Sequence, residues 1–244
     1  MSGLSEGGLP RHIAFIMDGN GRWAKKRMMP RNFGHRQGAE TLRDIAIACS
    51  KKGIEYMSVY AFSTENWSRP EDEVKGLMSL ITEFFGKYAA ELRKHNIRVK
   101  FMGEISRLPA EAHETCLDVI EMSQGLDGMT LNIGLNYGGR AEIARAAAQI
   151  ARDVVSGKLD AQSIDEEKIS QYLYTAGQPD VDILVRTGNE SRLSGYMLYQ
   201  CSYAEFFVLE MLWPDFNEKK LEEVLCSYKT RNRRFGNAPA PAQT

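Results

Sequence analysis

Short apolar runs alternate with amphipathic stretches along most of the chain. Between the runs, apolar residues recur every three or four positions, a spacing that predicts helices. The alternation predicts an α/β fold: a single domain with a mostly parallel central β-sheet of about six strands, flanked by helices on both faces. Five runs have the length of buried strands: Ile13–Met17, Tyr56–Phe62, Ile97–Met102, Met129–Leu135 and Val181–Val185.

The helical stretches are bounded by their periodicity and by flanking glycines and prolines. The strongest spans Glu71–His95, where apolar residues from Val74 to Leu92 form a broad stripe. Such a stripe most often packs on a sheet, although it can also line a ligand cavity. Further helices are predicted over Gly38–Lys52, Pro109–Gln124, Arg140–Ser156, Asp165–Thr175 and Asn217–Arg233.

Length and composition set the frame for the function. The chain has 244 residues, of which 43% are hydrophobic. That is enough for one domain, which we expect over residues 1–236. Residues 237–244, rich in Ala and Pro, are expected to form a disordered tail. The net charge of −1 gives no general attraction to nucleic acid.

Cysteine spacing and hydropathy bear on the location. The four cysteines form no C-x-x-C pair, which argues against a zinc site or a disulfide framework and favours the cytoplasm. No run approaches the ~20 apolar residues of a membrane span. The first ten residues also lack the apolar centre of a signal peptide.

The segment Asp18-Gly-Asn-Gly-Arg-Trp23 follows the first apolar run. Its two glycines let the main chain approach a ligand closely, and N–H groups at the start of a helix can bind an anion. Seven basic residues, His35 included, lie between Arg22 and Arg36. Asp18 would repel a phosphate unless a cation intervened, and a carboxylate combined with phosphate oxygens suits Mg²⁺. The segment therefore predicts a diphosphate and metal site.

The glycine pattern by itself leaves three interpretations open: an ordinary turn, a nucleotide site and another phosphate site. Gly19-x-Gly21-x-x-Ala24 also fits the dinucleotide fingerprint, but Met28-Met29-Pro30 interrupts the helix that should follow it. The acidic ribose ligand is expected near the end of the second strand, and that strand ends only at Phe62. The context therefore disfavours a nucleotide.

Similar residues follow four of the five runs. Because the carboxyl ends of parallel strands meet at one edge of a sheet, where such proteins bind ligands, we expect these loops to form one polar pocket. The pocket would hold more than one phosphate group, since each loop contains an arginine and three contain glycine. The loops are Asp18–Arg22, Ser63–Arg69, Asn136–Arg140 and Arg186–Gly188.

These loops resemble those of a known family, the cis-prenyltransferases, and within it the bacterial undecaprenyl diphosphate synthases. The resemblance extends from about Arg11 to Gly236. The matching motifs, in family order, are His12–Ala24, Gly34-His35, Ser63–Pro70, Leu131–Arg140, Asp182–Gly188 and Trp213–Phe216.

The resemblance implies a homodimeric, Mg²⁺-dependent transferase. Such an enzyme condenses isopentenyl diphosphate with farnesyl diphosphate, repeatedly and in cis geometry, to give undecaprenyl diphosphate, the lipid carrier precursor for peptidoglycan and other cell-wall glycans. It also implies a hydrophobic tunnel lined by the helix from Val74 to Leu92. Product release implies a transient membrane-surface contact, and the protein is expected in the cytoplasm or at the inner face of the plasma membrane.

The resemblance also implies roles for individual residues. The matches for the allylic substrate are Gly19, Asn20, Gly21, Arg22, Arg31, His35 and Arg69. Further substrate contacts match Trp23, Ser63, Thr64, Glu65, Trp67 and Leu193. The isopentenyl diphosphate positions match Arg186, Arg192 and Ser194. Asp18 and Glu205 match the metal carboxylates, and the catalytic positions match Asp18 and Asn66, the latter usually described as the proton acceptor.

Some alternatives stay open. Asn66 is a poor base, because a neutral amide has no useful pKa near 7, so water, a phosphate oxygen or Asp18 can take the proton instead. Asn189 and Ser191 stand where glycine and histidine are common in the family. A non-catalytic partner of such an enzyme and a dinucleotide oxidoreductase are the other functions considered. A trans-type prenyl synthase is disfavoured, since the chain has no Asp-Asp-x-x-Asp motif.

Overall fold

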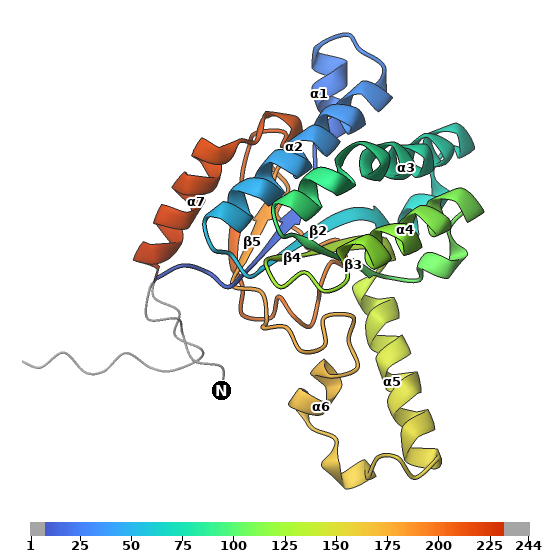
Figure 1. Cartoon of the computed structure of the whole chain (residues 1–244). Helices are drawn as coiled ribbons and strands as arrows, with labels where there is room; N and C mark the ends of the chain where they lie inside the picture. Colours follow the sequence, from blue (N-terminus) through green and yellow to red (C-terminus); the bar gives the residue numbers. More distant parts are fainter. Residues whose placement is uncertain (1–7, 232–244) are drawn as a thin grey trace, which may run out of the picture.

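The computed structural model describes residues 8–231, which form a central sheet with helices around it (Figure 1). All strands within these residues are parallel, in the order β3-β4-β2-β1-β5-β6. The predicted α/β fold with a mostly parallel sheet is confirmed. The strands are His12–Ile16 (β1), Tyr56–Ser63 (β2), Arg98–Met102 (β3), Thr130–Tyr137 (β4), Ile183–Arg186 (β5) and Glu205–Val208 (β6).

Five of these strands coincide with the predicted runs, but β6 had not been located. It has only four residues, Glu205–Val208, and its apolar run Phe206-Phe207-Val208 is shorter than the runs that predicted the other strands. Its pairing with β5 defines it as a strand. The predicted domain end at residue 236 and the tail over 237–244 lie outside the described residues.

The helices agree with the predictions except near the amino terminus and at α6. The latter covers only Glu166–Ser170 of the predicted Asp165–Thr175, because hydrogen-bonded turns follow it. α1 was not predicted, and α2 begins at Arg31 rather than Gly38, because Gly34 and Gly38 serve a close helix contact instead of a helix boundary. The bounds are Asn20–Lys26 (α1), Arg31–Lys51 (α2), Glu71–Lys94 (α3), Ala110–Ser123 (α4), Gly139–Val155 (α5), Glu166–Ser170 (α6) and Glu218–Thr230 (α7).

The two faces of the sheet are covered differently. Helices α2, α3, α4 and α7 form a layer over one face, whereas α5 and α6 extend away from the sheet (Figure 1). Along β1, Ile13 and Phe15 join the core under the helical layer, and Ala14 and Ile16 join a second core on the other side. Tyr196, from an irregular segment after β5, helps to close that second core. Because both faces of the sheet are covered, side chains on both sides of a strand are apolar, and the strands appear in the sequence as apolar runs.

The carboxyl end of β1 is the natural ligand site of this sheet. The strand order changes direction there, with β2 on one side of β1 and β5 on the other. The crevice at such a point is where open α/β sheets bind their ligands. Asp18 and the glycine turn lie directly beyond it. No described helix is both long enough and apolar enough to span a bilayer.

Candidate active site

A polar pocket of about 570 Å³ opens beyond β1. It lies between the turn that leads into α1, the start of α2 and the segment after β2. The structure thus brings together eight residues predicted from sequence: Asp18, Gly19, Asn20, Gly21, Arg22, Arg31, His35 and Arg69. Met17, Lys25, Met28 and Met29 complete the lining.

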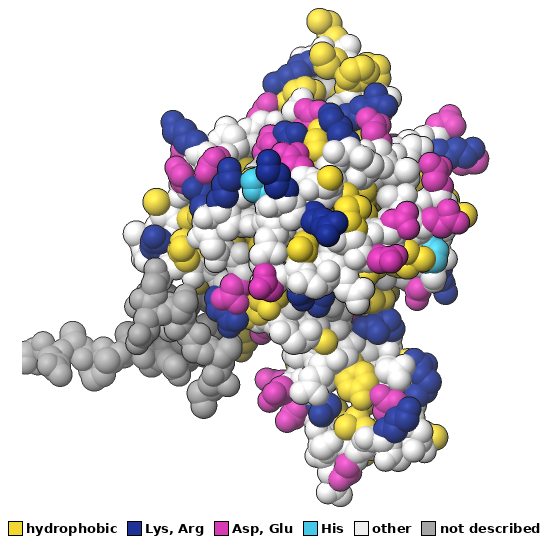
Figure 2. Space-filling view, viewed as in Figure 1, with side chains coloured by type: hydrophobic (Ala, Val, Ile, Leu, Met, Phe, Trp, Pro, Cys, Tyr) yellow, Lys and Arg dark blue, Asp and Glu magenta, His cyan; other side chains and the backbone are white. Residues whose placement is uncertain are grey.

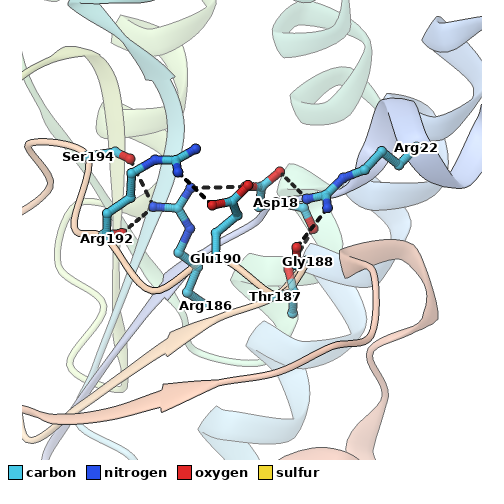
Figure 3. A network of polar contacts seen from close by, with 8 residues as sticks. All are labelled: Asp18, Arg22, Arg186, Thr187, Gly188, Glu190, Arg192 and Ser194. Atoms are coloured by element: carbon cyan, nitrogen blue, oxygen red, sulfur yellow. Dashed lines mark hydrogen bonds and ion pairs between the residues drawn. The ribbon is translucent and has the colours of Figure 1, made fainter.

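Asp18 is held between two arginines (Figure 3). Its carboxylate accepts hydrogen bonds from Arg22 Nη2 at 3.1 Å and from Arg186 Nη2 at 3.0 Å. Its main-chain carbonyl accepts hydrogen bonds from Thr187 Oγ1 at 2.7 Å and from the N–H of Trp213 at 3.0 Å. The side chain stays 30% exposed. The backbone is therefore fixed while the carboxylate can still meet a cation in the pocket.

The turn between β1 and α1 requires glycine. Gly19 has a φ of +110°, and a Cβ there would lie 2.8 Å from Leu212 Cδ2, so conformation and space both exclude a side chain. No side chain caps α1. The N–H groups of its first turn have no acceptor inside the helix, and an anion in the pocket can accept their hydrogen bonds.

Two glycines of α2 bring α1 close to the pocket wall. A Cβ on Gly34 would lie 2.0 Å from the carbonyl oxygen of Asn20, and one on Gly38 would lie 2.4 Å from Asn20 Oδ1. Asn20 Oδ1 is buried and has no hydrogen-bond partner among residues 8–231. Because an unpaired buried polar atom is costly, this oxygen is a candidate contact for a ligand.

Arg31 and Arg69 come from different elements and share one carboxylate. Glu73 Oε1 of α3 lies 3.3 Å from Arg31 Nη2 and 3.0 Å from Arg69 Nη1. The shared contact holds both guanidinium groups at the pocket. Since one carboxylate offsets only one of the two positive charges, a net positive charge is left to attract an anion.

His35 is a neutral member of the pocket. Burial, followed by the positive charges of Arg31 and Arg69, lowers the pKa of His35 to about 4. Its Nε2 is buried without a hydrogen-bond partner in the described part of the chain. The sequence grouped His35 with the basic residues that neutralise phosphate. A neutral imidazole can donate or accept a hydrogen bond without adding charge, and a contact of His35 with a phosphate stays a prediction.

A second polar cluster surrounds Arg186, the last residue of β5 (Figure 3). Arg186 is only 4% exposed. Its Nη1 donates to Ser194 Oγ at 2.9 Å and to the carbonyl of Arg192, and its Nε has no partner among the described residues. Arg192 is exposed and pairs with Glu190 at 2.6 Å. Because Arg186 also contacts Asp18, it joins this cluster to the polar pocket.

Asn66 has a defined structural contact. Ser63 and Asn66 form a capping box at the 3₁₀ turn Thr64–Ser68, in which the N–H of Ser63 donates to Asn66 Oδ1 at 3.1 Å. The amide oxygen is therefore already engaged. This geometry favours Asn66 as a group that orients its neighbours, in line with its lack of basicity.

Several other predicted contacts lie outside the pocket lining. Trp67 Nε1 donates to Asn136 Oδ1 at 2.8 Å, and Trp23 Nε1 donates to Asp215 Oδ1 at 2.7 Å. Arg27 stacks over the Trp23 ring at 4.0 Å. These contacts brace the loops that carry the site. The predicted residues outside the lining are Trp23, Ser63, Thr64, Glu65, Asn66, Trp67, Arg186, Arg192, Leu193, Ser194 and Glu205.

Glu205 does not approach Asp18 within one chain. Glu205 begins β6 and lies level with Ile183 and Ile13, at the amino ends of their strands. The carboxyl end of β1, at Ile16, lies roughly 10 Å further along the strand direction at the usual rise per residue, and Asp18 follows that end. Ligands of one Mg²⁺ lie about 2.1 Å from the ion. A single chain therefore does not unite the two predicted metal carboxylates, and Glu205 contacts Arg231 at 2.8 Å instead.

An apolar cavity of about 100 Å³ adjoins the polar pocket. Met17, Asn20 and His35 line both spaces. Residues of the α3 stripe pack in the core, and several of them also line this cavity; a ligand there stays a prediction. The rest of the cavity lining is Gly38, Ala39, Leu42, Ala61, Phe62, Leu77, Leu80, Ile81, Phe84, Phe85, Ile133, Leu135 and Trp213.

A cationic pocket that opens beside an apolar cavity fits a ligand with a phosphate head and a hydrocarbon tail. Comparison with known proteins agrees with this chemistry. Residues 16–236 match the family described as "Putative undecaprenyl diphosphate synthase". The chain belongs to this prenyltransferase family.

Isoprenyl transferases resemble the chain over nearly its whole length. It is 46% identical to an isoprenyl transferase of Clostridium perfringens over 96% of this chain and 92% of the relative. An isoprenyl transferase of Streptococcus thermophilus is also 46% identical, over 93% of each chain.

Solved structures share the fold. Lavandulyl diphosphate synthase from Lavandula x intermedia, in complex with dimethylallyl diphosphate, superposes with a TM-score of 0.91 at 35% identity, over 94% of this chain and 99% of that one. A probable undecaprenyl diphosphate synthase from Campylobacter jejuni superposes with a TM-score of 0.78 at 32% identity, over 96% of this chain and 100% of that one.

The loop after β5 holds Asn189 where the sequence resemblance predicts a glycine, and its backbone is left-handed at that residue. Asn189 has a φ of +58°, a region that asparagine tolerates better than most residues other than glycine. Its N–H donates to the carbonyl of Leu209 at 2.9 Å. Leu193 packs against the second core, and Ser191 is exposed. The loop is therefore anchored despite the missing glycine.

Three residues that hold the site in place through hydrogen bonds or ion pairs were not predicted. Glu73 orders two arginines, and its spacing of four from Arg69 on a predicted helix was the signal that could have revealed it. Thr187 fixes the carbonyl of Asp18, and Asp215 anchors α1 through Trp23. No local pattern reveals these last two contacts, because each joins segments more than 160 residues apart.

Proposed function

We propose that the protein condenses isopentenyl diphosphate with farnesyl diphosphate, repeatedly and in cis geometry, to give undecaprenyl diphosphate for peptidoglycan and other cell-wall glycans. The observation that carries the proposal is the junction at Asn20 and His35, where an arginine-rich pocket meets an apolar cavity. A prenyl diphosphate divides in the same way into an anionic head and an apolar tail. Family membership supports the reaction class.

The allylic diphosphate is assigned to the polar pocket. The N–H groups over Gly19–Arg22 and the side chains of Arg31, His35 and Arg69 would contact its oxygens. Negative charge builds on this group as its bond to the allylic carbon breaks. Donors held in advance by packing and ion pairs stabilise that charge without reorganising, which is commonly a large part of catalysis.

Mg²⁺ is part of the proposal, and Asp18 is the residue that would hold it. No group of three or more His, Cys, Asp or Glu within residues 8–231 could bind a metal alone. Phosphate oxygens of the substrate would therefore complete the ligands, as is usual for Mg²⁺. Asp18 fits this use, since it is a partly exposed carboxylate in a basic pocket. When bound, the ion supplies further neutralisation of the departing diphosphate.

Isopentenyl diphosphate is assigned to the cluster around Arg186. The unpartnered Nε of Arg186, together with Arg192 and Ser194, supports this choice. Leu193 and the segment Ser63–Trp67 would form the surrounding wall. Two separate phosphate anchors would hold the isopentenyl double bond near the allylic carbon, which lowers the entropic cost of reaction.

The proton released after condensation needs an acceptor. Asn66 is proposed to orient that step from its capping position, while water, a phosphate oxygen or Asp18 takes the proton. The amide has no useful basicity of its own. Arg186 also contacts Asp18 directly, so the carboxylate lies where the two substrates would meet.

The working enzyme is proposed to be a homodimer that binds no nucleic acid. β6 is an edge strand; its last residue, Val208, is 39% exposed, and Tyr203, just before the strand, is 63% exposed. Such an edge suits a second copy. Pairing there would let Glu205 of one copy serve the isopentenyl site of the other, which a single chain does not allow.

The apolar cavity is proposed as the start of the tunnel for the growing chain. At about 0.8 kcal/mol for each buried CH₂, an added five-carbon unit gains up to about 4 kcal/mol, so tunnel length biases the stopping point. Release of such a product calls for a transient membrane-surface contact. A cytoplasmic location, with contact at the inner face of the plasma membrane, is supported by the four free cysteines.

Product analysis tests the function. Farnesyl diphosphate, labelled isopentenyl diphosphate and Mg²⁺ should give long prenyl products that chromatography separates by length. Asp18→Ala should leave the circular dichroism spectrum unchanged and lower incorporation at least a thousand-fold, because the metal carboxylate is lost. The matched control is Asp118→Ala on the exposed side of α4, which should retain full activity.

Other results would favour the alternatives. Near-normal incorporation by Asp18→Ala would refute the assignment of the metal site. An inactive parent protein that becomes active only with a second polypeptide would favour a non-catalytic partner role. Saturable quenching of NADH fluorescence would revive the oxidoreductase hypothesis.

A further inference from the structure

The turn between α1 and α2 exposes a cluster of large apolar side chains. Met28 is 96% exposed, Phe33 48% and Met29 44%. The space-filling view shows apolar side chains at the outer end of α1, with Lys and Arg side chains beside them (Figure 2). We name Met28, Met29 and Phe33 the apolar tip. Apolar groups gathered on a projecting surface mark a contact with another apolar phase.

The exposure of Met28 is built into the end of α1. The N–H of Met29 donates to the carbonyl of Ala24 at 3.0 Å, and the N–H of Met28 donates to Lys25 at 3.1 Å. These are the two hydrogen bonds of a Schellman motif, whose left-handed position usually holds glycine. Here it holds Met28, with a φ of +55°. The fold thus accepts an unfavourable backbone conformation and presents a long apolar side chain to the exterior.

The tip lies within a basic segment. Residues 20–36 contain six Lys or Arg and no Asp or Glu, although the whole chain has a net charge of −1. The four arginines have acidic partners on other parts of the chain or at Asp18. Lys25 and Lys26 are exposed and form no ion pair with any described residue. Two uncompensated cations therefore flank the apolar tip.

A second apolar patch gives a useful contrast. Leu117 and Ile120 of α4 are 48% and 38% exposed. Their exposed neighbours on the same helix are Glu114, Asp118 and Glu121. An anionic surface would repel that patch, whereas it would attract the tip. Charge complementarity therefore selects the tip as the surface suited to a negatively charged lipid layer.

We propose that the apolar tip, together with Lys25 and Lys26, docks onto the surface of an anionic phospholipid bilayer. Large apolar side chains beside cations are the composition that binds such interfaces, and methionine adapts to a fluid surface. Met28 and Met29 also line the polar pocket. Docking would therefore set the mouth of the pocket against the headgroups. This inference rests on the proposed function, since a lipid diphosphate would leave the pocket beside the tip.

Sedimentation with vesicles, using the full-length protein without substrates, tests the docking. Phosphatidylcholine vesicles that contain phosphatidylglycerol should bind the protein, and vesicles of phosphatidylcholine alone should bind it far less. Met28→Asp should weaken binding about ten-fold, because an apolar side chain that docking would bury in the bilayer is replaced by a negative charge. Lys26→Gln should weaken it about five-fold and reduce its dependence on salt.

Matched variants control for surface changes elsewhere. Val155, at the end of α5, is 90% exposed, and Val155→Asp should bind the anionic vesicles like the parent protein. Lys158→Gln, also exposed, should do the same. Unchanged binding by Met28→Asp, or equal losses in Met28→Asp and Val155→Asp, would overturn the proposal.

A fluorescent label reports where the contact forms. Cys226 is exposed and the other three cysteines are buried, so a thiol-reactive, environment-sensitive dye on the native protein probes α7. The same dye on Met28→Cys, in a Cys226→Ser background, probes the tip. The emission should shift to the blue on anionic vesicles only at position 28. A shift only at Cys226 would refute docking through the tip.

Turnover is measured separately, in detergent without vesicles. If the protein makes prenyl products yet binds no anionic vesicles, the docking alone is refuted. The tip would then be the contact surface for a protein partner. A protein that binds vesicles through the tip yet makes no product refutes the proposed reaction alone.

Discussion

At the scale of single residues, Arg186 is the side chain that joins the two parts of the candidate active site. It is a nearly buried cation, which is costly unless its donors are satisfied. Its planar fork meets Asp18 on one side and Ser194 and the Arg192 carbonyl on the other. A single side chain thereby sets the spacing between the metal carboxylate and the loop assigned to isopentenyl diphosphate.

Arg186→Lys should break the link between Asp18 and the loop assigned to isopentenyl diphosphate. A lysine ammonium is a single point and cannot contact Asp18 and Ser194 as a fork does. Loss of one charged hydrogen bond, worth about 1.5–3 kcal/mol, should raise the KM for isopentenyl diphosphate roughly ten- to hundred-fold. Steady-state kinetics at saturating farnesyl diphosphate measure this. Arg140→Lys, an exposed change near the end of β4, should behave as the parent, and equal effects of the two variants would contradict the role of Arg186.

At the scale of elements, the contact between α1 and α2 shapes the pocket. α1 has only seven residues and no side-chain cap, so its position depends on packing. Gly34 and Gly38 let α2 touch Asn20, and Asp215 holds the opposite side through Trp23. The helix that presents the diphosphate-binding backbone is therefore fixed by its neighbours.

Gly34→Ala should disturb that contact. The added Cβ would lie 2.0 Å from a carbonyl oxygen that cannot move freely, so overpacking should lower the free energy of unfolding by about 1–3 kcal/mol and slow turnover. Denaturation in urea and a product assay measure both effects. Gly86→Ala on α3 has nothing within 4 Å of the new Cβ and should stabilise by up to about 1 kcal/mol. A Gly34→Ala variant with the turnover and the free energy of unfolding of the parent would contradict this role of the contact between α1 and α2.

The sequence predicted elements where the pattern was continuous. The runs in β1, β2, β3, β4 and β5 and the stripe of α3 agree with the structure because burial on both faces, or along one helix face, leaves a periodic signal. It missed α1 and β6, which are short and held mainly by tertiary contacts. The loop residues of the polar pocket were predicted from their chemistry and family likeness. The separation of Glu205 from Asp18 was not, since strand register is invisible in one sequence.

At the scale of the whole molecule, a polar network crosses the sheet beneath the site. Neutral His12 donates through Nδ1 to the carbonyl of Pro179 at 2.9 Å, so its Nε2 accepts the hydrogen bond of 2.7 Å from Ser58. Ser58 in turn accepts from Asn132 at 3.0 Å. Residues of β1, β2 and β4 and the segment before β5 are thus joined. The network requires an uncharged imidazole, and burial lowers the pKa of His12 to about 4.

Stability should therefore fall in mild acid. The folded pKa of His12 lies below the usual 6.5, so the unfolded chain binds the proton more tightly and acid favours unfolding. The loss develops as the pH drops from about 6.5 to about 4, and His12 should contribute about 2 kcal/mol of it between pH 7 and pH 5. His35 acts in the same direction.

Urea denaturation at several pH values checks this dependence. His12→Asn keeps a donor near Nδ1 but cannot titrate, so it should flatten the slope between pH 7 and pH 5. His95→Asn, at the end of α3, is the control and should keep the slope of the parent. A parent protein equally stable at both pH values would contradict the neutral state of His12.

The arrangement of strands also governs when the site can exist during synthesis. β1 leaves the ribosome first, yet it pairs with β5 and its Asp18 carbonyl is fixed by Thr187 and Trp213. Chains that end before β5 leave one edge of β1 unpaired, and chains that end before Trp213 also lack the hydrogen bond from its N–H to the Asp18 carbonyl and part of the apolar cavity lining. Because an exposed apolar edge aggregates readily, the nascent protein depends on protection until its last quarter is made, and fragments should retain no partial activity.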